Sequence, residues 1–483
     1  MAERGVLQNI FRREFLITRE EADALFDWAP ASSYWAAREP VSPRDLLALV
    51  GPPPGAPPES GAALSYLRVR QVGPVNDFTY EPFQRLNVIT GDNSLGKTFL
   101  LEAAWAALTG EWAACSLLPN HAATKSGPRI DYGVATRTKN VLRATASYDW
   151  ERQQWKPVRP SKVQSGLAIF ARYDGSFAVW DPARAPGADA GRDPHITEHI
   201  VFKKEHIWDG RDIDVQGRKR VVCNGLVRDW VAWQTGKSSH IFDSLVACLH
   251  GLSPGDGERL RPGQPVRLPF DSRDFPTLTM PYGDVPIVHA SAGIQRIAAL
   301  AYFLVWSWHE HMMNCELSRR EPQRRIILLV DEIEAHLHPR WQREIVPALV
   351  QTVAALQTQA LPQVHIATHS PMVMASLEAV FDEEVDALWH LTLKRDFVGL
   401  DQLEFVKRGP SDMWLMSEVF GLEQPRSLPA EKAMSQAKDL QMRDSADRDQ
   451  IAGVHAELKK WLAQDDAFWP RWLFWAKQKG VEI

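Results

Sequence analysis

Eight consecutive residues have the composition and spacing of a loop that holds phosphate groups. They fit the pattern G-x-x-x-x-G-K-[ST], between an apolar, β-branched stretch and a run of helix-forming residues. They are Gly91, Asp92, Asn93, Ser94, Leu95, Gly96, Lys97 and Thr98. The glycines allow backbone N–H groups to approach phosphate oxygens, and the start of a helix adds a favourable dipole. We therefore expect Lys97 to reach the β- and γ-phosphates of ATP and Thr98 to bind Mg²⁺.

A pair of acids follows an apolar run in "IILLVDEIEAHLHP", residues 326–339. A carboxylate at the end of a buried parallel strand lies at the carboxyl edge of the sheet, where ligands bind. We expect Asp331 to complete the Mg²⁺ shell and Glu332 to act as the base that activates water. The alternative is an acidic surface turn, which does not explain the apolar run before the acids.

Two more segments carry polar groups next to expected apolar elements. In "VHIATHSP", His369 follows an apolar strand and is placed to sense a γ-phosphate; a solvent-exposed loop histidine is the alternative. In "HASAGIQRI", Ser291 and Gly293 open a long helix, whose N–H groups form a second anion-binding helix start. A simple N-cap remains the alternative, because one phosphate site needs no second cradle unless that cradle serves another subunit.

The elements that position these groups alternate between strands and helices. "RRIILLV" is typical of a fully buried strand, and "QVHIATHS" predicts a strand with its exit loop. Long helices are expected at "AGIQRIAALAYFLVWSWHEHM" and "PRWQREIVPALVQTVAAL". Between residues 110 and 200 the pattern indicates hairpins, one of them with an Asp174-Gly175 turn. The expected fold class is α/β.

The order of these four motifs resembles that of ABC-type ATPases, over roughly residues 62–405. The "DEIEAHLHP" and "THSP" forms resemble the RecF/OLD-like branch. The resemblance implies an ABC-type P-loop ATPase head, with a mixed or parallel sheet, helices and an antiparallel β subdomain. It also implies a head-to-tail dimer in which Ser291 and Gly293 close on ATP bound by the partner's Lys97.

The sequence departs from the transporter pattern at several positions. Ala290, Ala292 and Ile294 stand at the Leu, first Gly and Gln places of L-S-G-G-Q. A glutamine that senses the γ-phosphate has no clear position, and Gln153 and Gln154 are only guesses. These departures argue against transporter-type coupling but not against ATP binding.

The chain is expected to have four parts. They are an N-terminal helical extension (1–50), a Pro/Gly linker (51–61), the ATPase head (62–408) and a helical, Trp-rich C-terminal segment (409–483). In the last part, Trp469, Trp472 and Trp475 predict an aromatic helix face. This face either packs onto the ATPase core or forms an effector or oligomer interface.

Compact heads without coiled-coil arms resemble the ATPase subunits of bacterial anti-phage systems of the Septu and PARIS types. That resemblance implies a homodimer or higher oligomer that controls a separate effector, a Toprim or HNH nuclease, with DNA or a phage protein as the trigger. Asp212-x-Asp214 and "HEHMMN" (309–314) are interpreted as a surface turn and a solvated helix end, so no nuclease is expected in this chain. Two alternatives stay open: a RecF-like DNA repair ATPase without an effector, and a scaffold that sequesters a toxin and uses ATP as a latch.

Composition further narrows the functional classes to which the chain could belong. The formal net charge is −5, so nucleic-acid binding would need a local basic face such as Arg218 to Arg220. The four cysteines form no CxxC pair, which favours reduced thiols in a cytoplasmic protein. The N-terminus has no signal-peptide pattern, and the longest apolar run, Ile297 to Trp308, is too short to span a membrane.

Overall fold

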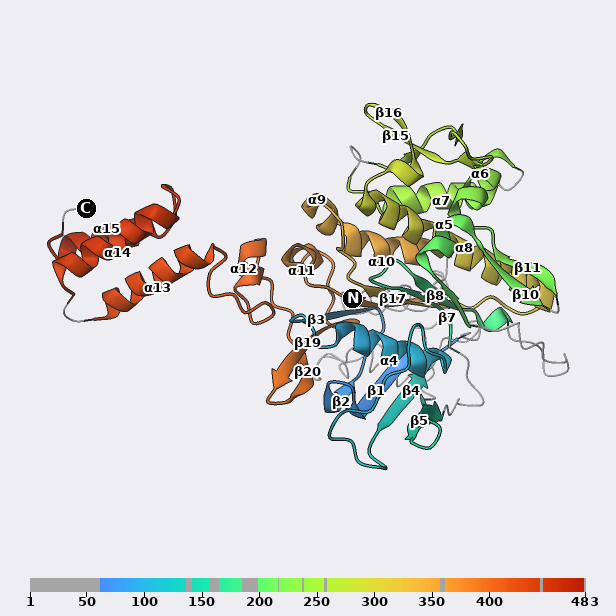
Figure 1. Cartoon of the computed structure of the whole chain (residues 1–483), viewed down its shortest axis with the longest axis horizontal. Coiled ribbons are helices and arrows are strands. Elements are labelled where there is room, and N and C mark those ends of the chain that lie inside the picture. The colour runs from blue at the N-terminus through green and yellow to red at the C-terminus, as the bar shows by residue number, and fades with distance from the viewer. Residues whose placement is uncertain are drawn as a thin grey trace, which may run out of the picture. The chain divides into compact units, whose positions relative to one another are not determined.

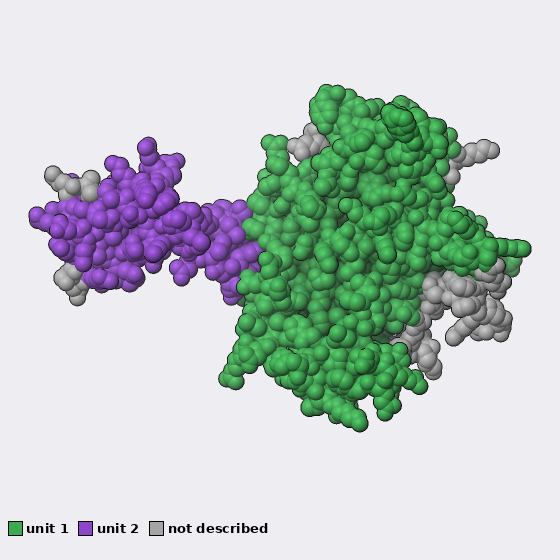
Figure 2. Space-filling model, viewed as in Figure 1, with its two compact units in different colours: residues 1–407 green, residues 408–483 purple. Residues whose placement is uncertain are grey.

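The computed structural model describes most of the chain as two compact units. The described residues are 61–135, 141–156, 165–184, 199–215, 217–236, 239–255, 259–356, 361–443 and 446–481. The units are Met1–Lys407 and Arg408–Ile483 (Figure 2). The expected extension (1–50) and linker (51–61) lie outside the described residues, apart from Gly61.

An eight-stranded sheet is the centre of the first unit, in the order β20-β19-β3-β18-β17-β7-β8-β9. The strands are β3 (Leu86–Gly91), β7 (Leu167–Ala171), β8 (Phe177–Trp180), β9 (His199–Phe202), β17 (Arg325–Asp331), β18 (Leu361–Ala367), β19 (Asp386–Lys394) and β20 (Phe397–Leu403). The five strands from β19 to β7 run parallel, and the outer strands pair antiparallel. Every residue of β17 is buried, which explains its continuous apolar run.

A second sheet covers the helix that follows the glycine-rich loop (Figure 1). It is antiparallel, in the order β2-β1-β4-β5-β6, with β1 (Ala63–Val72), β2 (Val75–Tyr80), β4 (Arg129–Ala135), β5 (Val141–Asp149) and β6 (Gln154–Lys156). Helix α4 (Lys97–Thr109) contacts both sheets, and its apolar residues share one core with them. The expected α/β fold class, with a largely parallel sheet and an antiparallel β subdomain, is confirmed.

Helices lie on the opposite side of the large sheet from α4, some in contact with its strands and others packed on those helices (Figure 1). They are α5 (Lys204–Asp209), α6 (Leu226–Thr235), α7 (Ser239–Gly251), α8 (Ala292–Ser318), α9 (Pro339–Gln342), α10 (Ile345–Ala355) and α11 (Pro371–Leu377). Short strands join them: β10 (Arg211–Val215), β11 (Arg218–Cys223), β12 (Arg261–Pro262), β13 (Val266–Arg267), β14 (Asp274–Phe275), β15 (Thr277–Met280) and β16 (Gly283–Pro286). The helix expected from residue 339 onward is broken between α9 and α10. Pro347 explains the break, because proline is tolerated only in the first turn of a helix.

The predicted solvated helix end at residues 309–314 is wrong for its central histidine. His311 is fully buried in α8, and its Nδ1 atom lies 2.7 Å from Oδ1 of Asp181. Its Nε2 atom accepts a hydrogen bond from the main-chain N–H of Gln323. His311 is therefore a hydrogen-bonded core residue.

Among the helices within the described ranges, none combines the length and apolarity that a membrane span requires.

The second unit has its own core. Its helices are α12 (Ser411–Leu415), α13 (Leu428–Met442), α14 (Arg448–Trp461) and α15 (Trp469–Gln478). Phe468 and Trp472, on the aromatic face expected from the sequence, are buried together with Ala433 and Leu458 from α13 and α14. Phe468 and Trp472 of this face therefore close the core of the small unit itself, and Trp469 and Trp475 are partly buried beside them.

Candidate functional site

Three neighbouring parallel strands end at the same edge of the large sheet. Ala367 of β18 lies beside both Ile89 of β3 and Asp331 of β17. The segments that follow these strands are the glycine-rich loop, the acidic pair and the "THSP" turn. Strand pairing thus brings together residues that are up to 278 positions apart in the sequence, from Gly91 to His369.

Two glycines give the loop its backbone path. Gly91 has φ 141° and Gly96 has φ 94°, values that residues with a Cβ atom rarely adopt. A Cβ on Gly91 would also lie 2.8 Å from the main-chain oxygen of Leu391. Asp92, Asn93 and Ser94 between them are exposed at the tip, whereas Leu95 packs against the core. The tip is therefore open to a ligand while both ends are fixed.

Lys97 is buried at the start of α4, with 6% of its surface exposed. Its Nζ atom donates hydrogen bonds to the main-chain oxygens of Gly91 (2.7 Å) and Asp92 (3.0 Å). Burial lowers the pKa of Lys97 to about 8, although the nearby carboxylates of Asp331 and Glu334 oppose this shift. The ammonium thus lies on the loop itself, where a phosphate would compete with the two carbonyl oxygens.

Thr98 and Asp331 meet across the site. The Thr98 hydroxyl donates to Oδ2 of Asp331 at 2.7 Å, joining α4 to the end of β17. Burial raises the pKa of Asp331, and the hydrogen bond from Thr98 opposes that shift. A hydroxyl and a carboxylate oxygen at this separation are the donor set that Mg²⁺ prefers. The residues present therefore fit the expected magnesium site.

The acidic segment contains a third acid that the sequence reasoning missed. Glu334 accepts hydrogen bonds from the Thr368 hydroxyl (2.9 Å) and from the main-chain N–H of His369 (2.5 Å). Burial is the main cause that raises its pKa. Glu332, two residues earlier, has a left-handed backbone, with φ 50°, which turns the chain sharply after β17. Glu334 therefore fixes the loop of His369, and the second acid after Asp331 in "DEIE" was the signal for it.

His369 lies near the lysine of the loop. Burial lowers the pKa of the His369 imidazole, and the charge of Lys97 lowers it further. The imidazole is therefore neutral at pH 7, able to accept one hydrogen bond and donate another. The structure places His369 where the sequence predicted it, at the edge that also carries Gly91 and Asp331.

The start of α8 is capped by Ser291, as in the simple N-cap alternative that the sequence allowed. The Ser291 hydroxyl accepts from the main-chain N–H of Ile294 at 3.5 Å, and Ser291 itself is exposed. Gly293 is buried, and a Cβ on it would lie 2.6 Å from the main-chain oxygen of His336. Gly293 thus allows α8 to approach the loop that follows the acidic pair, and Ser291 remains accessible beside it.

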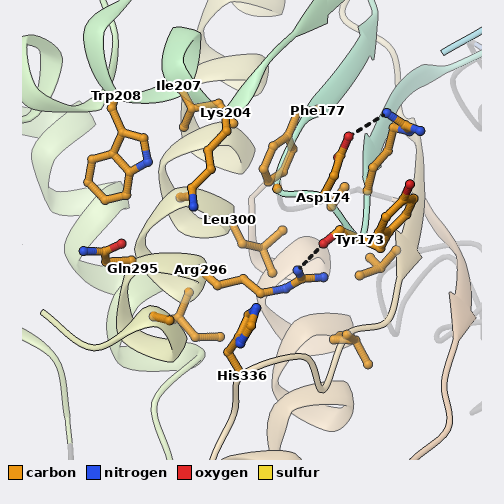
Figure 3. Close-up of a pocket in the computed structure, with 18 of the residues that line it drawn as sticks. Tyr173, Asp174, Phe177, Lys204, Ile207, Trp208, Gln295, Arg296, Leu300 and His336 are labelled. Carbon is orange, nitrogen blue, oxygen red and sulfur yellow. Dashed lines mark hydrogen bonds and ion pairs between the residues drawn. The ribbon is translucent and has the colours of Figure 1, made fainter. Parts of the chain in front are cut away.

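An arginine that was not singled out in the sequence connects α8 to the acidic pair. Arg296 donates from Nη2 to the main-chain oxygens of Asp331 (2.8 Å) and Glu332 (2.9 Å), and from Nη1 to that of Tyr173 (3.2 Å) (Figure 3). Burial lowers its pKa, and the nearby carboxylates oppose that shift. Arg296 stands five residues after Ser291 in "SAGIQR", but nothing in that pattern indicates main-chain partners.

The two guesses for a γ-phosphate-sensing glutamine, Gln153 and Gln154, lie at the β5–β6 turn. This turn belongs to the antiparallel sheet and not to the large sheet, which carries the glycine-rich loop. On the side of β17 away from β18 lies β7, and Arg172 and Tyr173 directly follow this strand. Arg172 pairs with Glu102 of α4 at 3.2 Å, so this turn is tied to the phosphate-loop helix.

Comparisons with known proteins find relatives of parts of this chain. Residues 282–375 match the family model described as "AAA domain, putative AbiEii toxin, Type IV TA system". The "Retron Ec83 probable ATPase" of Escherichia coli is 26% identical over 141 residues, which cover 29% of this chain and 23% of that protein. The "Septu protein PtuA" of Bacillus mycoides (strain KBAB4) is 36% identical over 132 residues, covering 27% of this chain and 16% of that protein. The chain resembles ATPases of defence-system type.

Solved structures were matched at low similarity. The SMC head domain from Thermotoga maritima is 12% identical, with a TM-score of 0.36, over 71% of this chain and 99% of that one. The structure of the recombination mediator protein RecF with ATPrS is 13% identical, with a TM-score of 0.35, over 72% of this chain and 99% of that one. The predicted resemblance to AAA-type ATPase subunits of defence systems is confirmed by the AAA domain match and the two sequence relatives.

Proposed function

We propose that this protein binds and hydrolyses ATP with Mg²⁺. The observation that carries the proposal is the 2.7 Å contact between Thr98 and Asp331, with Lys97 folded onto the glycine-rich loop beside it. Thr98 and Asp331 would hold Mg²⁺, which would neutralise phosphate charge during transfer of the terminal phosphoryl group to water. A chain with this hydroxyl, carboxylate and ammonium at one sheet edge has the groups that this chemistry needs.

Each residue then has a distinct task. The N–H groups of the 91–98 loop and the Lys97 ammonium bind phosphate, while Thr98 and Asp331 hold the metal. Glu332 accepts the proton of the attacking water. The neutral His369 imidazole hydrogen-bonds the terminal phosphate, while Glu334 accepts from the main-chain N–H of the same residue.

Two copies of the chain form a head-to-tail dimer in this proposal. The exposed Ser291 at the start of α8 supports it, because its hydroxyl and the following N–H groups offer an anion site that the chain's own loop does not need. Ser291 and Gly293 then close on the nucleotide of the partner subunit. Hydrolysis would require both copies.

The ATPase controls a separate effector, a Toprim or HNH nuclease, in a bacterial anti-phage complex. The two relatives of defence-system type support this assignment. Purification from the native host tests it, since a co-purifying nuclease is expected. Tight binding to gapped DNA without such a partner would instead indicate a repair ATPase, and an inhibited toxin in the complex would indicate a sequestering scaffold.

The catalytic assignment is tested with Glu332→Gln and Lys97→Ala. Glu332→Gln should retain ATP, lose turnover and form a longer-lived dimer with ATP in light scattering. Lys97→Ala should lose nucleotide binding. Glu383→Gln, at an exposed position outside the site, is the matched control and should behave as wild type. Wild-type turnover in Glu332→Gln would remove Glu332 from the mechanism.

The shared site is tested by mixing two inactive variants. Ser291→Arg should bind ATP but not hydrolyse it, since Lys97 and Asp331 remain intact. In a mixed dimer with Lys97→Ala, one site combines the intact lysine of the Ser291→Arg chain with the intact helix start of the Lys97→Ala chain, and the other site carries both defects. One site is therefore complete, so part of the activity should return, as it should when each variant is mixed with wild type. No recovery in the double mixture would exclude this arrangement.

A further inference from the structure

A small pocket opens beside Arg296, on the side of α8 that faces α5 and the β7–β8 turn (Figure 3). Its volume is about 110 Å³. Apolar side chains form the inner part, among them Phe177, Ile207 and Leu300. It lies outside the glycine-rich loop, so the proposed nucleotide site does not use it.

The charges around this pocket are unbalanced. Arg172 pairs with Glu102 and Asp174, and Arg296 donates to main-chain oxygens. Lys204 lines the same pocket, and no hydrogen bond or ion pair joins its ammonium to any residue that the structure describes. Figure 3 shows its side chain extending from α5 toward Leu300 and Gln295. The pocket therefore combines an apolar interior with one unmatched positive charge.

Its size restricts what can occupy it. Pockets that bury cofactors or drug-sized ligands have volumes of roughly 300–1,000 Å³. A volume of about 110 Å³ holds a group the size of one side chain. Anchor residues of protein partners fill pockets of this kind at the centre of an interface.

We infer that this pocket is the anchor point for an acidic segment of a partner protein, which inserts a leucine-sized side chain and pairs a neighbouring carboxylate with Lys204. Charge complementarity selects the acidic segment, because Lys204 is the charged lining group without a partner among the described residues. The partner contacts the same turns of α8 that carry Arg296. This inference rests on the proposed function only for the existence of a partner.

The test is a peptide titration of the full chain with labelled isoleucine methyl groups. The probe is an acetylated Gly-Glu-Leu-Glu-Gly amide, compared with Gly-Lys-Leu-Lys-Gly and Gly-Glu-Ser-Glu-Gly peptides. The acidic leucine peptide should shift the NMR signals of Ile207 and Ile333, which line the pocket. The basic peptide and the serine peptide should bind at least about fivefold more weakly.

Lys204→Glu and Lys203→Glu form a matched pair. Both residues are exposed, but Lys203 does not line the pocket. Lys204→Glu should weaken the acidic leucine peptide about tenfold, and Lys203→Glu less than twofold in 0.15 M salt, where charges beyond about 8 Å are screened. Equal loss in both variants, or unmoved pocket methyl signals, would overturn the inference.

Free glutamate is the last arm of the test. If it shifts the pocket methyl signals as strongly as the peptide, the site binds a small carboxylate and the docking role is refuted. The titration needs no ATP. Its failure is therefore distinguishable from failure of the proposed ATPase, which the Glu332→Gln and Lys97→Ala variants test separately.

Discussion

The buried lysine of the glycine-rich loop makes ATP affinity depend on pH. Burial holds the pKa of Lys97 at about 8 in the free protein. Bound phosphates should return it toward its usual value near 10.4, because they favour the charged form. Binding is therefore coupled to proton uptake wherever the free lysine is neutral, and affinity should fall as pH rises through 8.

The size of this effect follows from the pKa. With a pKa of about 8, Lys97 is charged in about nine-tenths of free molecules at pH 7 and in about one-tenth at pH 9. The dissociation constant for a non-hydrolysable ATP analogue should rise about tenfold across this range, equivalent to about 1.4 kcal/mol. Isothermal titration calorimetry in two buffers of different ionisation enthalpy measures the affinity and the proton uptake together.

Lys97→Arg is the control for this pH dependence. Arginine stays charged throughout the range, so whatever affinity the variant retains should be constant from pH 7 to pH 9. A change of less than threefold in wild type would refute the argument from Lys97. An equal fall in Lys97→Arg would assign the titration to another group.

Three further predictions concern the packing around the site and the small unit. Arg296→Gln should lower the ATP turnover number by at least about tenfold with less than a threefold change in ATP affinity, because the substitution releases the acidic pair but not the phosphate loop. Arg296→Lys should recover part of the turnover. Equal losses in turnover and affinity would contradict a positioning role for Arg296. Gly293→Ala should also abolish turnover, since its Cβ would lie 2.6 Å from the His336 oxygen, whereas Gly453→Ala in α14 meets nothing within 4 Å and should leave turnover unchanged. Trp472→Ala should destabilise the small unit by roughly 3–5 kcal/mol, which faster proteolysis of residues 408–483 would show, and nucleotide affinity should be retained. The side chain of Phe474 is 66% exposed, so Phe474→Ala should not speed this proteolysis.

The sequence was enough to locate residues whose role follows from the type of their side chain and from the strand that precedes them. Lys97, Thr98, Asp331 and His369 were assigned to one site because parallel strands end at a common edge, and the strand pairing shows them there. The acid at position 334 is visible in "DEIE", but Glu334 was missed because local spacing does not show that it accepts hydrogen bonds from Thr368 and His369, 34 and 35 positions later.

The aromatic helix face shows a different limit of the sequence. Its period predicted a buried face on α15, and Trp472 is indeed fully buried. The period does not say which surface covers that face, because any apolar surface would do. The structure supplies α13 and α14 of the same unit, which local spacing could not distinguish from the ATPase core.

The contacts of Arg296 have a consequence for comparing related sequences. Its guanidinium binds main-chain oxygens at positions 173, 331 and 332, and no side chain there takes part in those bonds. Substitution at position 173 would leave the contact intact, so natural variation there would not track variation at position 296. Residue co-variation would therefore overlook this link between α8 and the acidic pair, and only the retention of an arginine would record it across evolution.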